Sequence, residues 1–102
     1  MSSSAKPNHQ LKAEREFRVG DLSTPVRVRI YQRLSDGALV VEQSHFIKTS
    51  IQYLPYAVNE YSGNEAEAFN QLVTTVTNFY EEAVRRGYQA SDSWLVPNSA
   101  FE

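Results

Sequence analysis

The chain has 102 residues, a net charge of -2, 41% hydrophobic residues and no cysteine. This size and composition predict one small globular domain. The absence of cysteine excludes disulfide scaffolds, thiol chemistry and cysteine-ligated metal sites. The sequence has no apolar run long enough to cross a membrane, and its polar N-terminus lacks the pattern of a secretory signal. We therefore expect a cytoplasmic protein without membrane association.

The N-terminal segment differs in composition from the rest of the chain. Residues 1–12 are rich in Ser, Pro, Asn and Lys and offer little that could join a core. Such a composition is typical of a disordered terminus. We predict a disordered lead-in over residues 1–12 and a single α+β domain over residues 13–102.

Three segments alternate between apolar and polar residues, which is the period of a β-strand. The first includes Phe17, the second spans residues 26–34 and the third spans residues 39–47. Between the second and third, Asp36 and Gly37 form the pair that favours a two-residue hairpin turn. The pattern therefore predicts an antiparallel hairpin that follows a first strand.

The length of this turn sets the register, and the register decides which side chains share a face. A two-residue turn places Ile30 opposite Gln43 and Val28 opposite His45. A three-residue turn would place Ile30 opposite Glu42 and mix polarity on the core face, so we prefer the shorter turn. The predicted solvated face carries Arg27, Arg29, Tyr31 and Arg33, and the predicted apolar face carries Val26, Val28, Ile30 and Leu34.

After the third strand and a long connection, apolar residues recur at helical spacing, which predicts an amphipathic helix of about 22 residues. Asn64 followed by Glu67 fits a capping box at its start, and Ser62 followed by Glu65 is the alternative start. Gly87 follows two arginines, which is typical of a helix C-terminus.

The C-terminal segment carries Trp94 and Leu95, which we expect to dock on the domain as a short edge strand that Pro97 ends. The order of elements predicts an α+β fold: a three-stranded antiparallel meander (β-β-β-α) with one long amphipathic helix packed on one face and a docking C-terminal tail. The predicted core consists of Phe17, Val19, Val26, Val28, Ile30, Leu34, Leu39, Val41, Ile47, Phe69, Leu72, Val73, Val76, Phe79, Tyr80 and Val84, with Trp94 and Leu95 at its border.

The connection before the helix, residues 48–62, is apolar and aromatic and is long for a structureless loop. Tyrosine and tryptophan combine a large contact area with a polar tip and are enriched at interface hot spots. We hypothesise a non-enzymatic module that binds a partner protein, or a second copy of itself, through this connection and the tail. The alternative is that these residues seal the core. The predicted contact residues are Tyr53, Leu54, Tyr56, Tyr61 and Trp94.

Charge is distributed unevenly along the chain. Residues 1–50 contain eight Lys or Arg and five Asp or Glu, whereas residues 51–102 contain two and seven. The alternative function is therefore nucleic-acid or phosphoanion binding, because an arginine-rich strand can follow phosphates and an aromatic residue can stack on a base. The negative net charge and the absence of a known nucleic-acid-binding motif argue against it. The residues for this alternative are Arg27, Arg29, Tyr31 and Arg33.

Residues for catalysis are sparse. His45 is the one histidine outside the lead-in, and strand alternation is expected to turn the neighbouring Ser44 to the opposite face. The acidic residues of the helix are explained by its dipole and by ion pairs with nearby arginines. We predict no catalytic, cofactor-binding or metal site.

Overall fold

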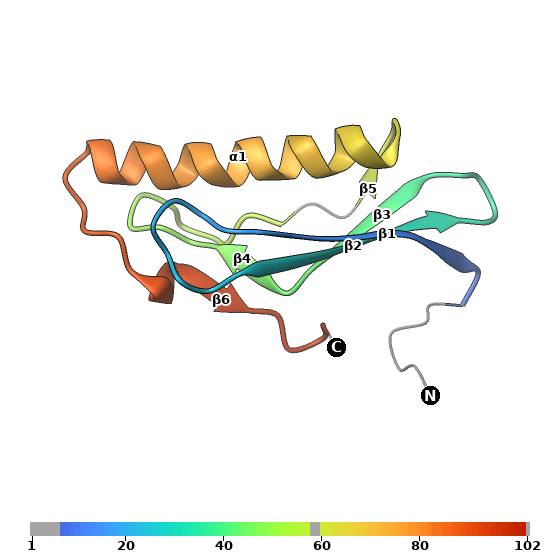
Figure 1. Cartoon of the computed structure of the whole chain (residues 1–102), viewed down its shortest axis with the longest axis horizontal. Helices are drawn as coiled ribbons and strands as arrows, with labels where there is room; N and C mark the ends of the chain where they lie inside the picture. The colour runs from blue at the N-terminus through green and yellow to red at the C-terminus, as the bar shows by residue number, and fades with distance from the viewer. Residues whose placement is uncertain (1–6, 58–59, 102) are drawn as a thin grey trace.

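One long helix lies across a face of an antiparallel sheet, and the C-terminal tail folds back on the other side of the sheet (Figure 1). The computed structural model of the chain describes residues 7–57 and 60–101. Four strands form the main sheet in the order β1 (His9–Phe17), β2 (Val26–Arg33), β3 (Leu39–Gln43) and β5 (Glu60–Tyr61). The other elements are β4 (His45–Ile47), α1 (Glu65–Arg85), the 3₁₀ turn η1 (Asp92–Trp94) and β6 (Leu95–Pro97). The predicted α+β fold, a meander with one helix and a docked tail, is confirmed.

The first strand begins earlier than its composition suggests. β1 starts at His9, so residues 9–12, which the composition assigns to the lead-in, pair with β2. Polar residues suffice here because β1 is a sheet edge, held by backbone hydrogen bonds to a single neighbour. The register shifts by one residue at Lys12, which forms a bulge. Residues 1–6 of the predicted lead-in lie outside the described residues.

Local sequence signals specify both ends of α1. Asn64 is the N-cap: its side-chain oxygen accepts a hydrogen bond from the Glu67 N–H at 2.9 Å, and its own N–H donates to Glu67 Oε1 at 3.4 Å. The capping box is therefore at Asn64, as predicted, and the alternative start at Ser62 is wrong. Gly87, at φ +96°, donates its N–H to the Val84 carbonyl and ends the helix. No helix within residues 7–57 and 60–101 is both long and apolar enough to span a bilayer.

The predicted register between β2 and β3 is wrong by two residues. Ile30 lies opposite Val41, not opposite Gln43. The Arg33 N–H donates to the Ala38 carbonyl at 2.8 Å, so the Asp-Gly pair belongs to a four-residue loop and not to a two-residue turn. Because a shift of two is one full period of a strand, each side chain keeps its predicted face.

The predicted third strand divides at Ser44. The Ser44 N–H donates to the Arg27 carbonyl at 2.8 Å, and after this contact the chain leaves β2. β4 then pairs with β6 in a second sheet, with Ile47 opposite Leu95. The predicted pairing of His45 with Val28 is therefore wrong, because the tail supplies a different partner, Pro97.

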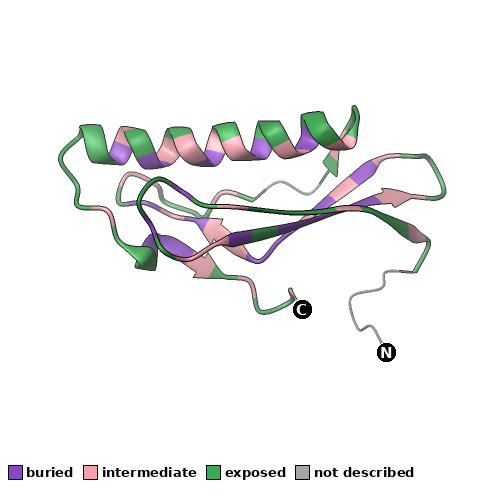
Figure 2. Ribbon diagram, in the orientation of Figure 1, coloured by how far each residue is buried: buried purple, intermediate pink, exposed green. Residues whose placement is uncertain are grey.

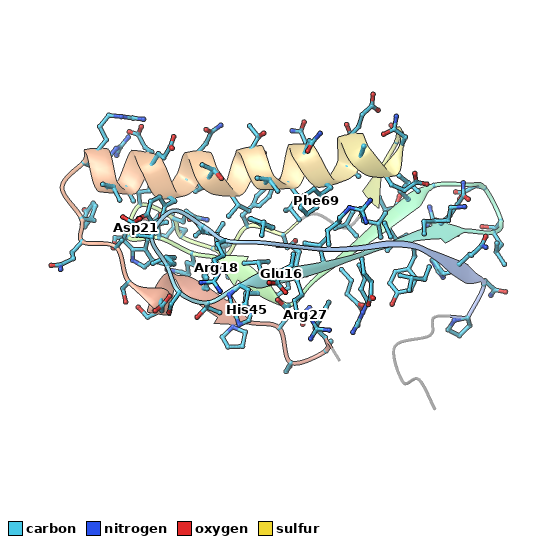
Figure 3. The ribbon with its side chains drawn as sticks, viewed as in Figure 1. Glu16, Arg18, Asp21, Arg27, His45 and Phe69 are labelled. Carbon is cyan, nitrogen blue, oxygen red and sulfur yellow. The ribbon has the colours of Figure 1, made fainter. Side chains whose placement is uncertain are left out.

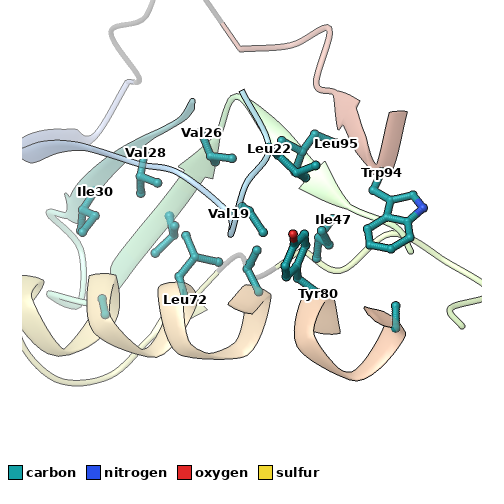
Figure 4. Close-up of a cluster of buried hydrophobic side chains, with 14 of the residues drawn as sticks. Val19, Leu22, Val26, Val28, Ile30, Ile47, Leu72, Tyr80, Trp94 and Leu95 are labelled. Carbon is teal, nitrogen blue, oxygen red and sulfur yellow. The ribbon is translucent and has the colours of Figure 1, made fainter. Parts of the chain in front are cut away.

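The core lies between α1 and the sheet (Figure 2, Figure 4). Two predicted core residues are exposed: Leu34, 64% exposed, lies in the hairpin loop, and Val84, 43% exposed, lies on the flank of α1. Val73, also predicted in the core, is half-buried. The buried hydrophobic residues are Val19, Leu22, Val26, Val28, Ile30, Tyr31, Leu39, Val41, Ile47, Ala68, Leu72, Val76, Tyr80, Ala83, Trp94 and Leu95. Four of these were outside the predicted set: Leu22, Tyr31, Ala68 and Ala83.

The tail docks through Trp94, which is 6% exposed. Its ring meets the ring of Tyr80 edge to face, with 5.9 Å between the centroids. The carboxylate of Asp92, in the same segment, accepts hydrogen bonds from the Ser23 N–H at 2.9 Å and from the Ser23 hydroxyl at 2.8 Å. These bonds lower the pKa of Asp92, chiefly through the Ser23 hydroxyl. The tail is thus part of the folded domain.

Replacing Trp94 with alanine should lower the free energy of unfolding by about 3 kcal/mol or more, because it leaves a cavity beside Tyr80. Tyr53→Ala, at a fully solvated position, should change it by less than about 0.5 kcal/mol. Urea denaturation followed by circular dichroism measures both values. Similar losses for the two variants would show that Trp94 is not a core residue.

Candidate functional site

The structure separates the five predicted contact residues into two groups. Tyr53 is 99% exposed and Leu54 is 76% exposed. Tyr56 and Tyr61 are partly buried and pack against the core, and Trp94 is buried within it. Docking of the tail removes the Trp94 ring from solvent, so we do not include it in the candidate contact surface. We call Tyr53 and Leu54 the loop tip and residues 48–57 the aromatic loop.

The aromatic loop is held in shape by the side chain of Gln52. Its carbonyl oxygen accepts hydrogen bonds from the Thr49 N–H at 2.8 Å and from the Thr49 hydroxyl at 3.0 Å. Its amide group donates to the Ile47 carbonyl at 3.1 Å and to the Leu54 carbonyl at 3.3 Å. The loop tip is thus positioned from inside the loop, without contributing its own side chains to the fold.

The base of the aromatic loop is fixed to the rest of the domain through Tyr56. The Tyr56 N–H donates to the Ile47 carbonyl at 2.8 Å and closes the loop at its two ends. The ring of Tyr56 packs on Phe79 of α1, with 5.5 Å between the centroids. This hydrogen bond and this ring contact together hold the loop against α1.

A groove lies where the aromatic loop meets α1. We call it the helix groove; its volume is about 390 Å³. Ile51 and Phe79 supply its apolar surface, and at one end Glu82 accepts hydrogen bonds from Arg85 and from Arg86. Sequence reasoning missed this groove, although Phe79 at the flank of the helical stripe was a signal. The groove is lined by Ile51, Thr75, Asn78, Phe79, Glu82 and Arg85.

The predicted anion-binding face lies on the side of the sheet away from α1, and we call it the outer sheet face. Arg29, at its centre, is only 6% exposed. Its guanidinium donates to Glu14 Oε2 at 3.0 Å and to Glu42 Oε1 at 3.4 Å, and the Phe101 ring covers it with 4.1 Å from Cζ to the ring centroid. Desolvation by burial lowers the pKa of Arg29, but the hydrogen bonds to Glu14 and Glu42 contribute to a net rise above its ordinary value.

Arg33 is also engaged by carboxylates. It donates to Asp36 Oδ1 at 3.0 Å and to Glu60 Oε2 at 2.9 Å, and these hydrogen bonds lower the pKa of both carboxyl groups. Tyr31 is 2% exposed. Arg27 is exposed, and its Cζ atom lies 5.4 Å from the centroid of the Phe101 ring. The four predicted anion-binding residues therefore do not form an open cationic surface. The alternation of β2 predicts a solvated face, because nothing in that pattern indicates that Phe101 of the tail covers the arginines.

The expectation that Ser44 and His45 point to opposite faces is wrong. Alternation is interrupted where the chain leaves the main sheet, and Ser44 Oγ lies 2.9 Å from His45 Nδ1. The same hydroxyl oxygen accepts a hydrogen bond from the Arg27 N–H at 2.8 Å. Both His45 and Arg27 lie on the side of the sheet away from α1 (Figure 3). Within the part of the chain that the structure describes, no three His, Asp or Glu side chains are grouped to hold a metal ion.

Glu42→Gln should lower the free energy of unfolding by about 1–3 kcal/mol, because among the described residues Glu42 is the less exposed of the two carboxylates paired with the buried Arg29. Glu14→Gln should cost less than about 1 kcal/mol, since solvent screens that more exposed partner. Urea denaturation at low and high salt would measure both losses. Equal losses for the two variants would contradict the described asymmetry.

The chain was compared with protein-family models, curated proteins and solved structures. No protein-family model, no curated protein and no solved structure matches it. The interpretation of the loop tip and the helix groove therefore rests on their own residues.

Proposed function

We propose that this protein is a small, non-enzymatic interaction module that binds a partner protein through the loop tip and the helix groove. The observation that carries the proposal is the exposure of Tyr53 and Leu54, 99% and 76%, on a loop that is otherwise hydrogen-bonded in place. The proposal places the module in the cytoplasm, where disulfides are rare and a chain without cysteine is at no disadvantage.

The energetics of the loop tip support this proposal. Burying a leucine side chain stabilises a complex by about 1.5–3 kcal/mol, and tyrosine is enriched among hot-spot residues. Binding is weakened when side chains and loops must first be ordered. The Gln52 hydrogen bonds order the aromatic loop before any partner arrives, so more of the burial energy is available for binding.

The alternative of nucleic-acid or phosphoanion binding has less support. It requires arginines that can exchange solvent for phosphate oxygens. Arg29 and Arg33 instead donate to carboxylates of the same chain, and the tail covers Arg29. A polyanion would have to displace these carboxylates, so we do not propose this function.

The double variant Tyr53→Ala, Leu54→Ala should lose at least about 10-fold in affinity for its partner, as expected when two central contact residues are truncated. Its melting temperature should stay within about 2 °C of the wild type, because neither side chain is buried. Affinity capture from an extract of the source cells, with the wild type as bait, identifies the partner and allows the affinity of the double variant to be measured.

The matched control is the double variant Leu34→Ala, Tyr88→Ala. These two residues are also exposed hydrophobics, 64% and 47%, but neither lies in the aromatic loop nor lines the helix groove. The control should bind like the wild type. If both double variants lose affinity equally, or if neither does, the loop tip is not the binding surface.

Gln52→Ala tests whether order in the aromatic loop matters for binding. Affinity should fall about 3- to 10-fold, since the cost of ordering the loop moves to the binding step. Hydrogen exchange at the loop amides should become faster. Gln32→Ala, which removes a single side-chain hydrogen bond to Gly37 in the distant hairpin, is the control and should leave affinity unchanged. Faster exchange without loss of affinity would contradict a role for the ordered loop.

A further inference from the structure

We propose that the partner at this surface is a second copy of the chain, with each loop tip seated in the helix groove of the other copy. This inference rests on the proposed function and names its partner. It requires a projecting apolar group and a groove of matching size beside it. The structure provides both.

The loop tip does not occupy the groove of its own chain. Tyr53 is 99% exposed, so its side chain contacts almost nothing in its own molecule. Ile51, two residues earlier, lines the helix groove, and the Cα atoms of the two residues are at most about 7 Å apart. The projecting group and a wall residue of the groove are therefore neighbours along the loop, and each lacks its complement within the chain.

This arrangement is self-complementary under a two-fold axis. When a surface carries a projection beside a recess, a rotation of 180° brings each projection to the recess of the other copy. Both contacts form together, and the assembly closes as a dimer instead of growing into a filament. The same argument does not apply to an unrelated partner, which would have to match both features independently.

The size and chemistry of the helix groove match the loop tip. The groove measures about 390 Å³, whereas a cavity of about 150 Å³ accepts a benzene ring. The groove therefore has room for an aromatic side chain. Ile51 and Phe79 offer apolar contact, and the side chains of Thr75 and Asn78 are polar groups on the groove wall that can bond a tyrosine hydroxyl.

Charge also favours a second copy at this surface. Residues 49–57 contain no charged side chain. In the groove, Glu82 is bonded to Arg85 and Arg86, so the copies meet without opposing unpaired carboxylates. The loop tip of a second copy therefore brings no charge into the groove.

Pairing through the sheet edge is a less suitable route to a dimer. β1 is the long edge strand of the main sheet, but it is interrupted by the bulge at Lys12. Glu14, Arg15 and Glu16 follow the bulge in succession. Bulges and charged residues are the features by which proteins prevent edge-to-edge pairing. The loop tip itself carries no charged side chain.

Sedimentation equilibrium of the full chain over a range of concentrations tests the proposal. The wild type should show a monomer–dimer equilibrium. Tyr53→Asp, which places a charge on the loop tip, and Asn78→Trp, which fills the groove from an exposed position on α1, should each weaken dimerisation at least about 10-fold. Leu34→Asp and Asn70→Trp change exposed positions outside this surface and should leave the equilibrium unchanged.

A mixture of the two weakened variants gives the sharpest result. A mixed dimer retains one intact contact, the normal loop tip of Asn78→Trp in the normal groove of Tyr53→Asp, whereas dimers of either variant alone retain none. Mixing should therefore produce more dimer than either variant alone. A monomeric wild type, a dimer insensitive to both variants, or a mixture with no additional dimer would each overturn the proposal.

These outcomes are distinct from failure of the proposed function. If the wild type is monomeric but a different captured protein loses affinity for the Tyr53→Ala, Leu54→Ala variant, the second copy is wrong as partner and the loop tip remains the binding surface. If the wild type is monomeric and no partner responds to that variant, both proposals are wrong.

Discussion

The alternation of side chains along β2 is the constraint on which both faces of the sheet depend. Val28 and Ile30 face α1 and are almost completely buried, so Arg29 between them must face the other way. A guanidinium in the middle of a sheet requires carboxylates and cover, which Glu14, Glu42 and the tail provide. With α1 on one face and ion pairs and the tail on the other, the guanidinium at the centre of the sheet is engaged within its own chain.

Features that a few neighbouring residues determine could be predicted from the sequence. Asn64 and Glu67 form the helix cap by contacts within one turn, and the alternation of β2 gives its two faces without knowledge of any partner strand. The hairpin register could not be predicted in the same way. A four-residue loop around Gly37 shifts the pairing by two, and this shift leaves the apolar pattern of both strands unchanged.

Features that depend on distant segments were beyond the sequence pattern. Ser44 interrupts the third strand because β6 pairs with the residues that follow, and Phe101 covers an arginine that the pattern places in solvent. The candidate site illustrates the same limit. The composition of the loop does not distinguish Tyr53 from Tyr56. In the structure the Tyr56 ring packs against Phe79, whereas the Tyr53 ring projects into solvent. Composition therefore located the aromatic loop but could not identify its tip.

The aromatic loop separates the residues that stabilise the fold from those that we propose to bind. Gln52 and Tyr56 hold the loop, whereas the loop tip contributes almost no buried area to its own chain. For folding alone, an exposed tyrosine and leucine side by side are a liability, because apolar surface promotes nonspecific association. A rigid loop limits this liability by presenting the two side chains in one geometry, which only a surface of matching shape can cover. The helix groove beside the loop is such a surface, and every copy of the chain carries it.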